Sequence, residues 1–179
     1  MHSRNSEWSF ILKYLPDISM FSNAKALRVL DVGCNESDLI SEIDNRGYAS
    51  FGIDCRVYFK PLPKEIHFLK GDITDPKITE VFGVQSFFYI VALSSIEHIG
   101  LGAYGEKKDE NGDRLALENI HKMLYNEGYF LITIPLEYWG SDSGRGYTPS
   151  RFNKLIEGLF KVYEITHNQG QICAVLVKI

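Results

Sequence analysis

The segment RVLDVGCNES at residues 28–37 constrains the fold of this chain more than any other. Its apolar first half contains one acid near the end, which predicts a buried parallel strand. Gly33 then permits a sharp turn, Asn35 and Ser37 supply capping side chains, and the apolar residues of 38–43 recur at helical spacing. A strand, a tight turn and a helix N-terminus place backbone N–H groups in a crevice where a small ligand can bind.

The size and charge of the chain limit its class. Its 179 residues suit one domain, and we expect a single domain over residues 1–179 in which residues 1–24 form a helical segment packed on the core. A formal charge of −4 argues against a nucleic-acid binder held by phosphate contacts. The longest apolar run, residues 87–93, is too short to span a bilayer, and the first residues lack the apolar core of a signal peptide. We therefore expect a cytoplasmic protein that does not bind membranes.

The cysteines and histidines give no sign of a metal site. Cys34, Cys55 and Cys173 are odd in number and far apart, and they fit no zinc-binding spacing. Reduced thiols are expected in the cytosol, which agrees with this pattern. The histidines are scattered and are not paired with acids at ligand spacing, so no metal is predicted.

Hydrophobic periodicity and turn residues predict a chain in which strands and helices alternate. The predicted strands are residues 26–32, 49–53, 66–69, 86–93, 129–134, 160–166 and 172–179, and the predicted helices are residues 7–14, 37–45, 75–82, 113–125 and 149–158. Ser6 and Asp75 are the expected caps of the first and third helices, and residues 126–128 are an expected turn. Long glycine-bearing connections are predicted at residues 94–111 and 136–148, and such segments are commonly functional.

This alternation is typical of a doubly wound parallel sheet. Only three residues, 168–170, separate the last two strands, so the last strand must run antiparallel. We therefore predict an α/β fold with a doubly wound, seven-stranded, mostly parallel sheet and an antiparallel C-terminal strand. Right-handed crossovers bring the following segments to the same sheet edge: residues 31–35, Asp54, Asp72, residues 94–98 and residues 135–139.

The motifs at this edge resemble those of class I S-adenosylmethionine-dependent methyltransferases. The resemblance covers residues 25–179 and rests on segments in the family's order: residues 29–34 as motif I, Asp54 closing the second strand, residues 71–73 after the third, and residues 122–129 before the fifth. Residues 94–105 resemble a subgroup of small bacterial and archaeal methyltransferases.

The resemblance implies a Rossmann-like methyltransferase fold and S-adenosyl-L-methionine as the cofactor. The positions that it implies for cofactor binding are Asp31, Gly33, Cys34, Asn35, Asp54, Cys55, Asp72, Ile73, Leu93 and Ser94. The chemistry of the cofactor agrees, because backbone N–H groups at the glycine turn suit its carboxylate, and Asp54 suits its two ribose hydroxyls. Asp72 and the Ile73 backbone occupy the family's adenine-binding positions. The alternative is that these acids only cap helices or end strands.

One departure from the family pattern concerns the glycines of motif I. The family favours Gly-x-Gly-x-Gly, whereas this chain keeps only Gly33 and has Asn35 and Ser37 at the other two positions. Asn visits the left-handed region more readily than most residues, but Ser restricts a close approach of the helix to the ligand. A nicotinamide enzyme would need Gly-x-Gly-x-x-Gly, which is missing. The alternative from another class is a methyltransferase-fold interaction or regulatory module whose site has decayed.

Candidate catalytic residues follow the fourth strand. His98 is a candidate base for a hydroxyl acceptor near neutral pH, and Glu97 is a candidate partner. The alternative is that both residues only hold the loop or the cofactor. Three aromatic residues are candidates for the wall of an acceptor pocket or for a lid: Tyr104, Tyr138 and Trp139. We expect the acceptor to be a small molecule or a glycan, and the sequence gives no oligomeric state.

Overall fold

The computed structural model describes residues 3–23, 25–35, 37–137 and 144–179. The strands are β1 Arg28–Val32, β2 Ala49–Asp54, β3 His67–Lys70, β4 Phe87–Leu93, β5 Leu124–Pro135, β6 Phe160–Asn168 and β7 Gln171–Lys178. The helices are α1 Ser3–Lys13, α2 Leu39–Asn45, α3 Ile78–Phe82, the short 3₁₀ helix η1 Ile96–His98, α4 Gly112–Met123 and α5 Pro149–Ile156. None of the described helices is long and apolar enough to cross a bilayer.

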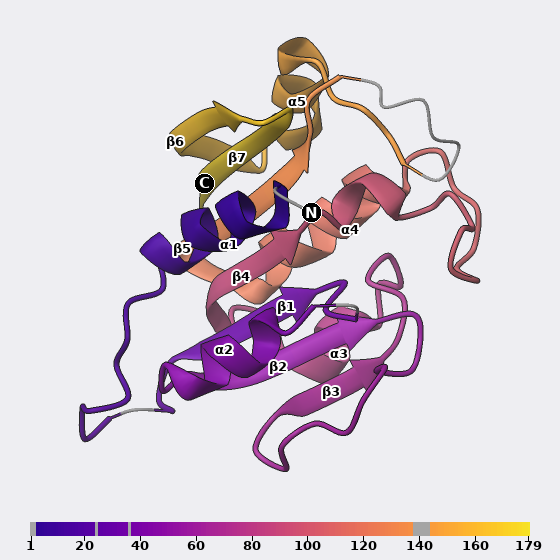
Figure 1. Ribbon diagram of the computed structural model, residues 1–179. Helices are drawn as coiled ribbons and strands as arrows, with labels where there is room; N and C mark the ends of the chain where they lie inside the picture. Colours follow the sequence, from indigo (N-terminus) through magenta and orange to yellow (C-terminus); the bar gives the residue numbers. More distant parts are fainter. Residues whose placement is uncertain (1–2, 24, 36, 138–143) are drawn as a thin grey trace.

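The strands form one sheet in the order β3-β2-β1-β4-β5-β7-β6 (Figure 1). The pairs from β3 to β5 are parallel, whereas β7 runs antiparallel to both β5 and β6. The prediction of a doubly wound, mostly parallel sheet with an antiparallel C-terminal strand is therefore confirmed. The chain reverses its direction of winding between β1 and β4, which is the point where folds of this kind place their ligands.

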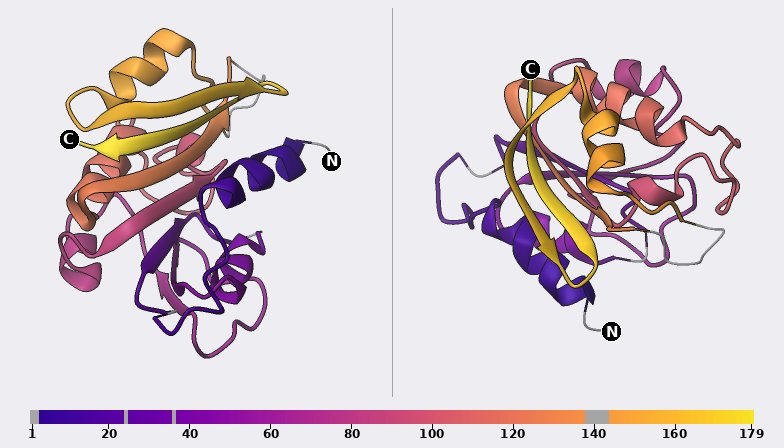
Figure 2. Two further views of the ribbon diagram at one scale, coloured as in Figure 1. Left: turned by 90° about the vertical axis from the view of Figure 1, so that its left-hand side faces the viewer. Right: turned by 90° about the horizontal axis from the view of Figure 1, so that it is seen from above.

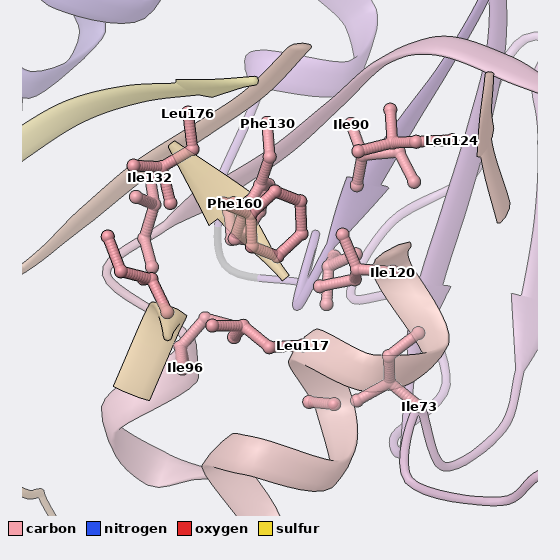
Figure 3. Packing of buried hydrophobic residues seen from close by; sticks show 14 of the residues in the cluster. Ile73, Ile90, Ile96, Leu117, Ile120, Leu124, Phe130, Ile132, Phe160 and Leu176 are labelled. Atoms are coloured by element: carbon pink, nitrogen blue, oxygen red, sulfur yellow. The ribbon is translucent and has the colours of Figure 1, made fainter. Parts of the chain in front are cut away.

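Helices cover both faces of the sheet (Figures 1 and 2). One apolar cluster joins α1 and α2 to the strands, and a larger one joins α3, α4 and α5 to the opposite face. Figure 3 shows the larger cluster, in which Leu117 and Ile120 of α4 meet Phe130 and Ile132 of β5. Because both faces are buried, β1, β4 and β5 have the continuous apolar sequences expected of central parallel strands.

Four predicted boundaries are wrong for local reasons. The first helix begins at Ser3, so Ser6 lies inside it and does not cap it. The second begins at Leu39, although Ser37 Oγ accepts the Leu39 N–H at 3.0 Å just before it. The third begins at Ile78, because Asp75 accepts the Lys77 N–H in a separate turn.

The fourth wrong boundary concerns residues 126–128, which lie inside β5 and not in a turn before it. Helix α4 ends at Met123 because Leu124 already pairs with Phe87 of β4. The register between β4 and β5 then shifts, which is the mark of a β-bulge. Residues 125–128 of β5 lie opposite residue 88 alone, and Glu127 has a φ of 61°. The extra residues are therefore accommodated with a left-handed backbone at Glu127, in the segment that the sequence predicts as a turn.

Candidate active site

A pocket of about 840 Å³, including its open mouth, lies at the C-terminal ends of β1, β2 and β4. The predicted site residues that line it are Gly33, Asn35, Asp54, Cys55, Asp72, Ile73, Leu93, Ser94 and His98. Three predicted residues, Asp31, Cys34 and Glu97, do not line it. The sheet topology therefore brings most of the predicted site to one place, because parallel strands present all their C-terminal ends at the same edge.

Asp54 ends β2 and is buried at the base of this pocket. Its Oδ2 accepts the Asn35 N–H at 3.1 Å. Its Oδ1 accepts the Arg56 backbone N–H at 2.9 Å and the Arg56 Nε–H at 3.2 Å. A carboxylate has about four lone-pair positions, and N–H donors of the protein already use three of them.

Arg56 is a pocket residue that the sequence analysis missed. Its guanidinium pairs with Asp54 and lies over the Tyr104 ring, 4.1 Å from the ring centroid. Tyr104 belongs to the connection after β4, so this contact joins two distant loops across the pocket. The only signal in the sequence is the position of Arg56 two residues after the acid that closes β2.

The loop that carries Tyr104 is held from within by Glu106. The Glu106 carboxylate accepts the backbone N–H groups of Gly102 at 2.6 Å, Ala103 at 3.2 Å and Tyr104 at 2.9 Å. Burial opposes ionisation of Glu106, but these backbone bonds outweigh it and lower the pKa of its carboxyl group. The loop therefore presents Tyr104 to the pocket with its conformation already fixed.

The turn after β1 is arranged differently from our expectation. We expected its amides to be open to the carboxylate of a ligand, but the N–H groups of Gly33 and Cys34 point to Ile53 O at 2.8 and 3.4 Å. The third amide, that of Asn35, is bonded to Asp54. The expectation is therefore wrong for these three amides, which fasten β1 to β2.

Gly33 has a φ of 72°, and a Cβ there would lie 2.4 Å from the Cβ of Ser95. Ser95 Oγ donates to Val32 O at 2.7 Å, which holds the loop after β4 against the turn. The glycine is therefore required both by backbone conformation and by close approach. The motif therefore keeps a glycine at a position where a side chain would push the loop after β4 away from the turn after β1.

Asn35 replaces the second glycine of the family pattern and has a structural use. Its Nδ2 donates to Val57 O and its Oδ1 accepts the Phe59 N–H, each at 3.0 Å. It therefore fixes the loop after β2, which also carries Arg56. The expected capping role is not seen, because the N-cap of α2 is Asp38, which makes no side-chain capping bond.

Two predicted cofactor residues point into the protein. The Cys34 side chain packs with Ile40 and Ile66, and burial raises the pKa of its thiol. Asp31 is also buried, and burial together with the nearby charge of Asp54 raises the pKa of its carboxyl group. Asp31 Oδ2 has no hydrogen-bond partner in the described structure.

Asp72 and Ile73 line the pocket at the end of β3. Asp72 Oδ1 accepts both the N–H and the hydroxyl of Thr74 at 2.8 Å, so the acid does stabilise a local turn. Cys55 also lines the pocket and donates to Tyr104 O at 3.6 Å. These contacts leave the ends of β2 and β3 as a polar rim beside the apolar side chains of Ile53 and Ile73.

Ser94 lines the pocket in a left-handed conformation, with a φ of 44°. Its N–H is held by the carbonyl and the hydroxyl oxygens of Thr133 at 3.1 and 3.0 Å. Its hydroxyl donates to Glu7 Oε1 in a short hydrogen bond. The sequence analysis missed Glu7, which lies on the N-terminal helix and is only 1% exposed.

Glu97 and His98 belong to η1, which lies next to the pocket. His98 lines the pocket, and its ring meets the Tyr104 ring edge-on at 5.5 Å. Its Nε2 lies 3.9 Å from Glu97 Oε1. Glu97 is 2% exposed, and burial together with the charge of Glu7 raises the pKa of its carboxyl group to about 8, although a backbone hydrogen bond opposes the shift.

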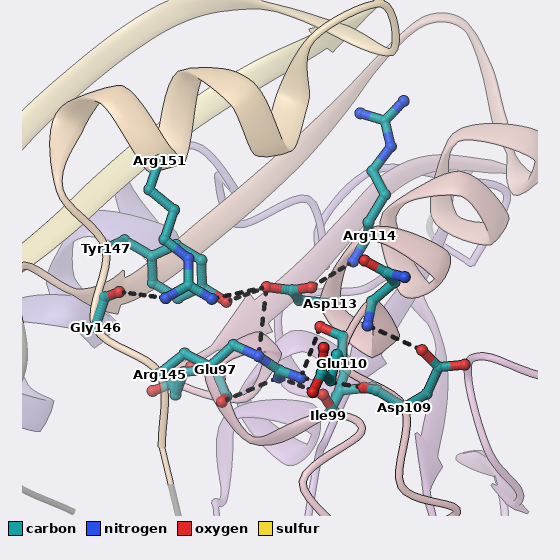
Figure 4. Close-up of polar contacts among 11 residues, drawn as sticks. Glu97, Ile99, Asp109, Glu110, Asp113, Arg114, Arg145, Gly146, Tyr147 and Arg151 are labelled. Carbon is teal, nitrogen blue, oxygen red and sulfur yellow. Dashed lines mark hydrogen bonds and ion pairs between the residues drawn. The ribbon is translucent and has the colours of Figure 1, made fainter.

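A polar cluster around Arg145 fixes the position of η1 (Figure 4). The Arg145 guanidinium donates to the carbonyl oxygens of Ile99, Asp109 and Glu110, and it lies 3.7 Å from Asp113. The Arg145 N–H also donates to Glu97 O at 3.0 Å. The charge of Arg145 is therefore used to hold backbone together, and the loop that carries Glu97 is rigidly tied to α4.

Two of the candidate lid residues, Tyr138 and Trp139, lie outside the described residues. Tyr104 was predicted with them, and it does line the pocket. Over residues 3–23, 25–35, 37–137 and 144–179, no group of three or more His, Cys, Asp or Glu side chains is placed to hold a metal ion.

Comparison with known proteins supports the fold assignment. The model of a protein family described as "Caenorhabditis protein of unknown function, DUF268" matches residues 78–174, more than half of the chain. No curated protein matches the sequence. Similar solved structures include a TehB-like S-adenosylmethionine-dependent methyltransferase from Corynebacterium glutamicum, with 21% identity, a TM-score of 0.68 and coverage of 97% of this chain and 87% of that one.

Two further solved structures resemble the chain over nearly all of its length. A putative S-adenosylmethionine-dependent methyltransferase from Listeria monocytogenes has 12% identity, a TM-score of 0.70 and coverage of 98% and 99% of the two chains. The Burkholderia thailandensis 1,6-didemethyltoxoflavin-N1-methyltransferase, solved with that compound and S-adenosylhomocysteine, has 14% identity, a TM-score of 0.66 and coverage of 97% and 84%. The chain therefore has a class I S-adenosylmethionine-dependent methyltransferase-like fold.

Proposed function

The chain belongs to the DUF268 family, and we propose that it is an S-adenosylmethionine-dependent methyltransferase whose acceptor is a small molecule or a glycan. The observation that carries the proposal is the pocket at the reversal point of the sheet, where Asp54, Asp72 and Ser94 follow three different strands. Ligands of open α/β sheets bind at this point. The solved structures of the same fold support the choice of cofactor.

The side chains of the pocket fit the cofactor in two respects. Asp54 and Asp72 place carboxylates at the ends of β2 and β3, where a ribose diol and an adenine amine would donate to them. Ile53 and Ile73 supply the apolar surface that a purine ring needs.

The contact between Arg56 and Asp54 opposes binding of the cofactor. Both ribose hydroxyls can bind Asp54 only after the Arg56 guanidinium leaves Oδ1, because two of the lone pairs accept backbone N–H groups and only one, on Oδ2, remains open. We infer that Arg56 and Tyr104 part when the cofactor enters, and that this step weakens the apparent affinity. The Asp54 carboxylate is therefore occupied by an internal contact that binding must break.

When bound, S-adenosylmethionine supplies an electrophilic methyl group on a sulfonium. The protein has to hold the acceptor in line with that group and exclude water, and such positioning can supply much of the rate. His98 is the titratable side chain on the acceptor side of the pocket wall, with Glu97 behind it. His98 would accept the acceptor's proton, and Glu97 would orient the imidazole.

Calorimetric titration with S-adenosylhomocysteine tests the proposal. We expect saturable binding of one ligand per chain, with weaker affinity than an unobstructed site would give. Absence of binding at millimolar ligand would overturn it. That result would favour the alternative, a methyltransferase-fold module without a cofactor. The structural explanation would then be that the amides after β1 bond to β2 and that Arg56 pairs with Asp54.

A further inference from the structure

Two buried side chains at the sheet edge that carries the pocket, one in η1 after β4 and one beside the last residue of β5, have oxygen atoms without a donor. Within the described residues, Glu97 Oε2 and Gln171 Oε1 accept no hydrogen bond, although the two residues are only 2% and 4% exposed. Buried polar atoms are almost always paired, so each exception calls for a physical reason. Gln171 Oε1 is an acceptor, and Glu97 Oε2 is one when the acid is ionised, so each of these atoms can accept a donor that the described residues do not supply.

Both carboxylates in this region lie one side chain behind the pocket wall. Ser94 lines the pocket and donates its hydroxyl to Glu7. His98 also lines the pocket, and Glu97 lies 3.9 Å behind its Nε2. The wall at this end consequently consists of two polar side chains, each backed by a buried acid.

Gln171 and Glu7 belong to the same face of the sheet. Cys173 pairs with Thr133 across β5 and β7, and Gln171 lies two residues earlier on β7, so its side chain leaves the same face. Burial and then the charge of Glu7 raise the pKa of the Cys173 thiol to about 11, which places Glu7 near β7. Glu7 of α1 therefore lies near both Glu97 of η1 and Cys173 of β7, and Glu7, Glu97 and Gln171 are together called the polar patch.

The described residues supply no cation to neutralise this patch. Glu7 and Glu97 form no ion pair with Lys or Arg in the described parts of the chain. Arg145 is close to Glu97, but its guanidinium is committed to backbone carbonyl oxygens and to Asp113. A second buried charge beside Glu7 is costly without a cation, so Glu97 favours its protonated form until a cation arrives from outside.

We propose, on the basis of the methyltransferase function proposed above, that the methyl acceptor is a primary or secondary amine bound at the His98 end of the pocket. In its ammonium form the amine brings a positive charge to the wall of Ser94 and His98, directly in front of the buried acids Glu7 and Glu97. A carboxylate acceptor would be repelled there. An alcohol would supply one donor and no charge, and it would bind less well.

The reaction balances with these groups. The ammonium has no lone pair, so it first gives a proton to His98, which is backed by Glu97. The nitrogen lone pair then forms the N–C bond while the C–S bond of the sulfonium breaks and its electron pair stays on the sulfur. The products are a methylated ammonium and a neutral thioether. Glu97 acts through His98 and is therefore a positioning residue.

The titration of Glu97 gives this inference a specific signature. Burial and the charge of Glu7 raise the Glu97 pKa to about 8, so the acid is mostly protonated at neutral pH in the free protein. The charged and titratable groups that face it are Glu7 from α1, His98 from η1, and Arg145 and Tyr147 from the segment before α5. Binding of a cation favours the ionised acid, and a proton is released.

The experiment uses the full chain saturated with S-adenosylhomocysteine. Calorimetry in two buffers of different ionisation enthalpy measures the affinity and proton release for phenethylamine, 2-phenylethanol and phenylacetate, and for glucosamine against glucose. We expect only the amines to bind with proton release, and their affinity to fall about tenfold for each pH unit below neutrality, as linkage to one proton requires. Glu97→Gln should weaken amine binding at least about tenfold and abolish its pH dependence.

Controls separate this inference from the function on which it rests. Glu80→Gln changes an exposed acid on α3 and should leave amine binding unchanged. Glu7→Gln gives a second test within the patch, with the same expected direction as Glu97→Gln. No binding of S-adenosylhomocysteine would overturn the proposed function and this inference with it. Binding of that ligand, with alcohols held as well as amines or with Glu97→Gln without effect, would overturn this inference alone.

Discussion

Removal of the Arg56 side chain should make the protein bind its cofactor more tightly. In the free protein the guanidinium donates to Asp54 Oδ1 at 3.2 Å and lies 4.1 Å from the Tyr104 ring centroid. A hydrogen bond to a charged group contributes about 1.5–3 kcal/mol, and a partly exposed cation–π contact about 0.5–1 kcal/mol. Because Arg56 is 29% exposed, solvent reduces these values, and we expect a net cost of about 1–2 kcal/mol for displacing it.

Arg56→Ala should therefore lower the dissociation constant of S-adenosylhomocysteine by about five- to thirtyfold in calorimetry. Without ligand, the free energy of unfolding of the variant should be about 1–2 kcal/mol lower than that of the wild type in denaturant melts, since the same contact is removed. Arg114→Ala is a matched control, because it removes an ion pair with Glu118 far from the pocket and should lower stability without changing affinity. Unchanged or weaker binding by Arg56→Ala would refute the view that Arg56 competes with the ligand.

Four further predictions concern other contacts of the site. Asp54→Ala should weaken S-adenosylhomocysteine binding by about 1–3 kcal/mol, and an unchanged dissociation constant would show that Asp54 does not hold the ribose. His98→Ala should slow turnover more than it weakens cofactor binding, whereas equal losses would indicate a positioning role. Gly33→Ala should destabilise the protein by about 2 kcal/mol or more in denaturant melts, because its φ is 72° and its Cβ would lie 2.4 Å from Ser95 Cβ; a wild-type melting profile would contradict this. Glu97 has a pKa raised to about 8 in the folded state, so stability should fall as the pH rises from the unfolded-state value through 8, and Glu97→Gln should remove this slope. A wild-type slope in that variant would mean that another group titrates.

The fold and the edge that carries the pocket could be predicted because they depend on periodic patterns and chain order. Asp54 and Asp72 follow apolar runs, and parallel strands must deliver such residues to one edge. The hydrogen bonds of the side chains at this edge follow no such pattern in the sequence. The hydroxyl of Ser94 meets Glu7 across 87 residues, and no local periodicity reports a contact of that kind.

In the turn after β1, too, the sequence predicts the backbone conformation but not the hydrogen-bond partners. Gly33 was correctly placed at a sharp turn, because its position between an apolar strand and a helix specifies its conformation. The partners of the neighbouring amides depend on how far β2 extends and where its carbonyl oxygens point. Asn35 looked like a cap or a tolerated substitute for glycine, and only the folded loop shows that it fastens residues 57–59.

A crystal structure of the protein grown with S-adenosylhomocysteine tests the central claim most directly. The account predicts the ribose on Asp54, the adenine beside Asp72 and Ile73, and the Arg56 guanidinium displaced from Asp54. A structure with saturating ligand in which Arg56 still pairs with Asp54 beneath Tyr104, and the pocket holds no ligand, would contradict it.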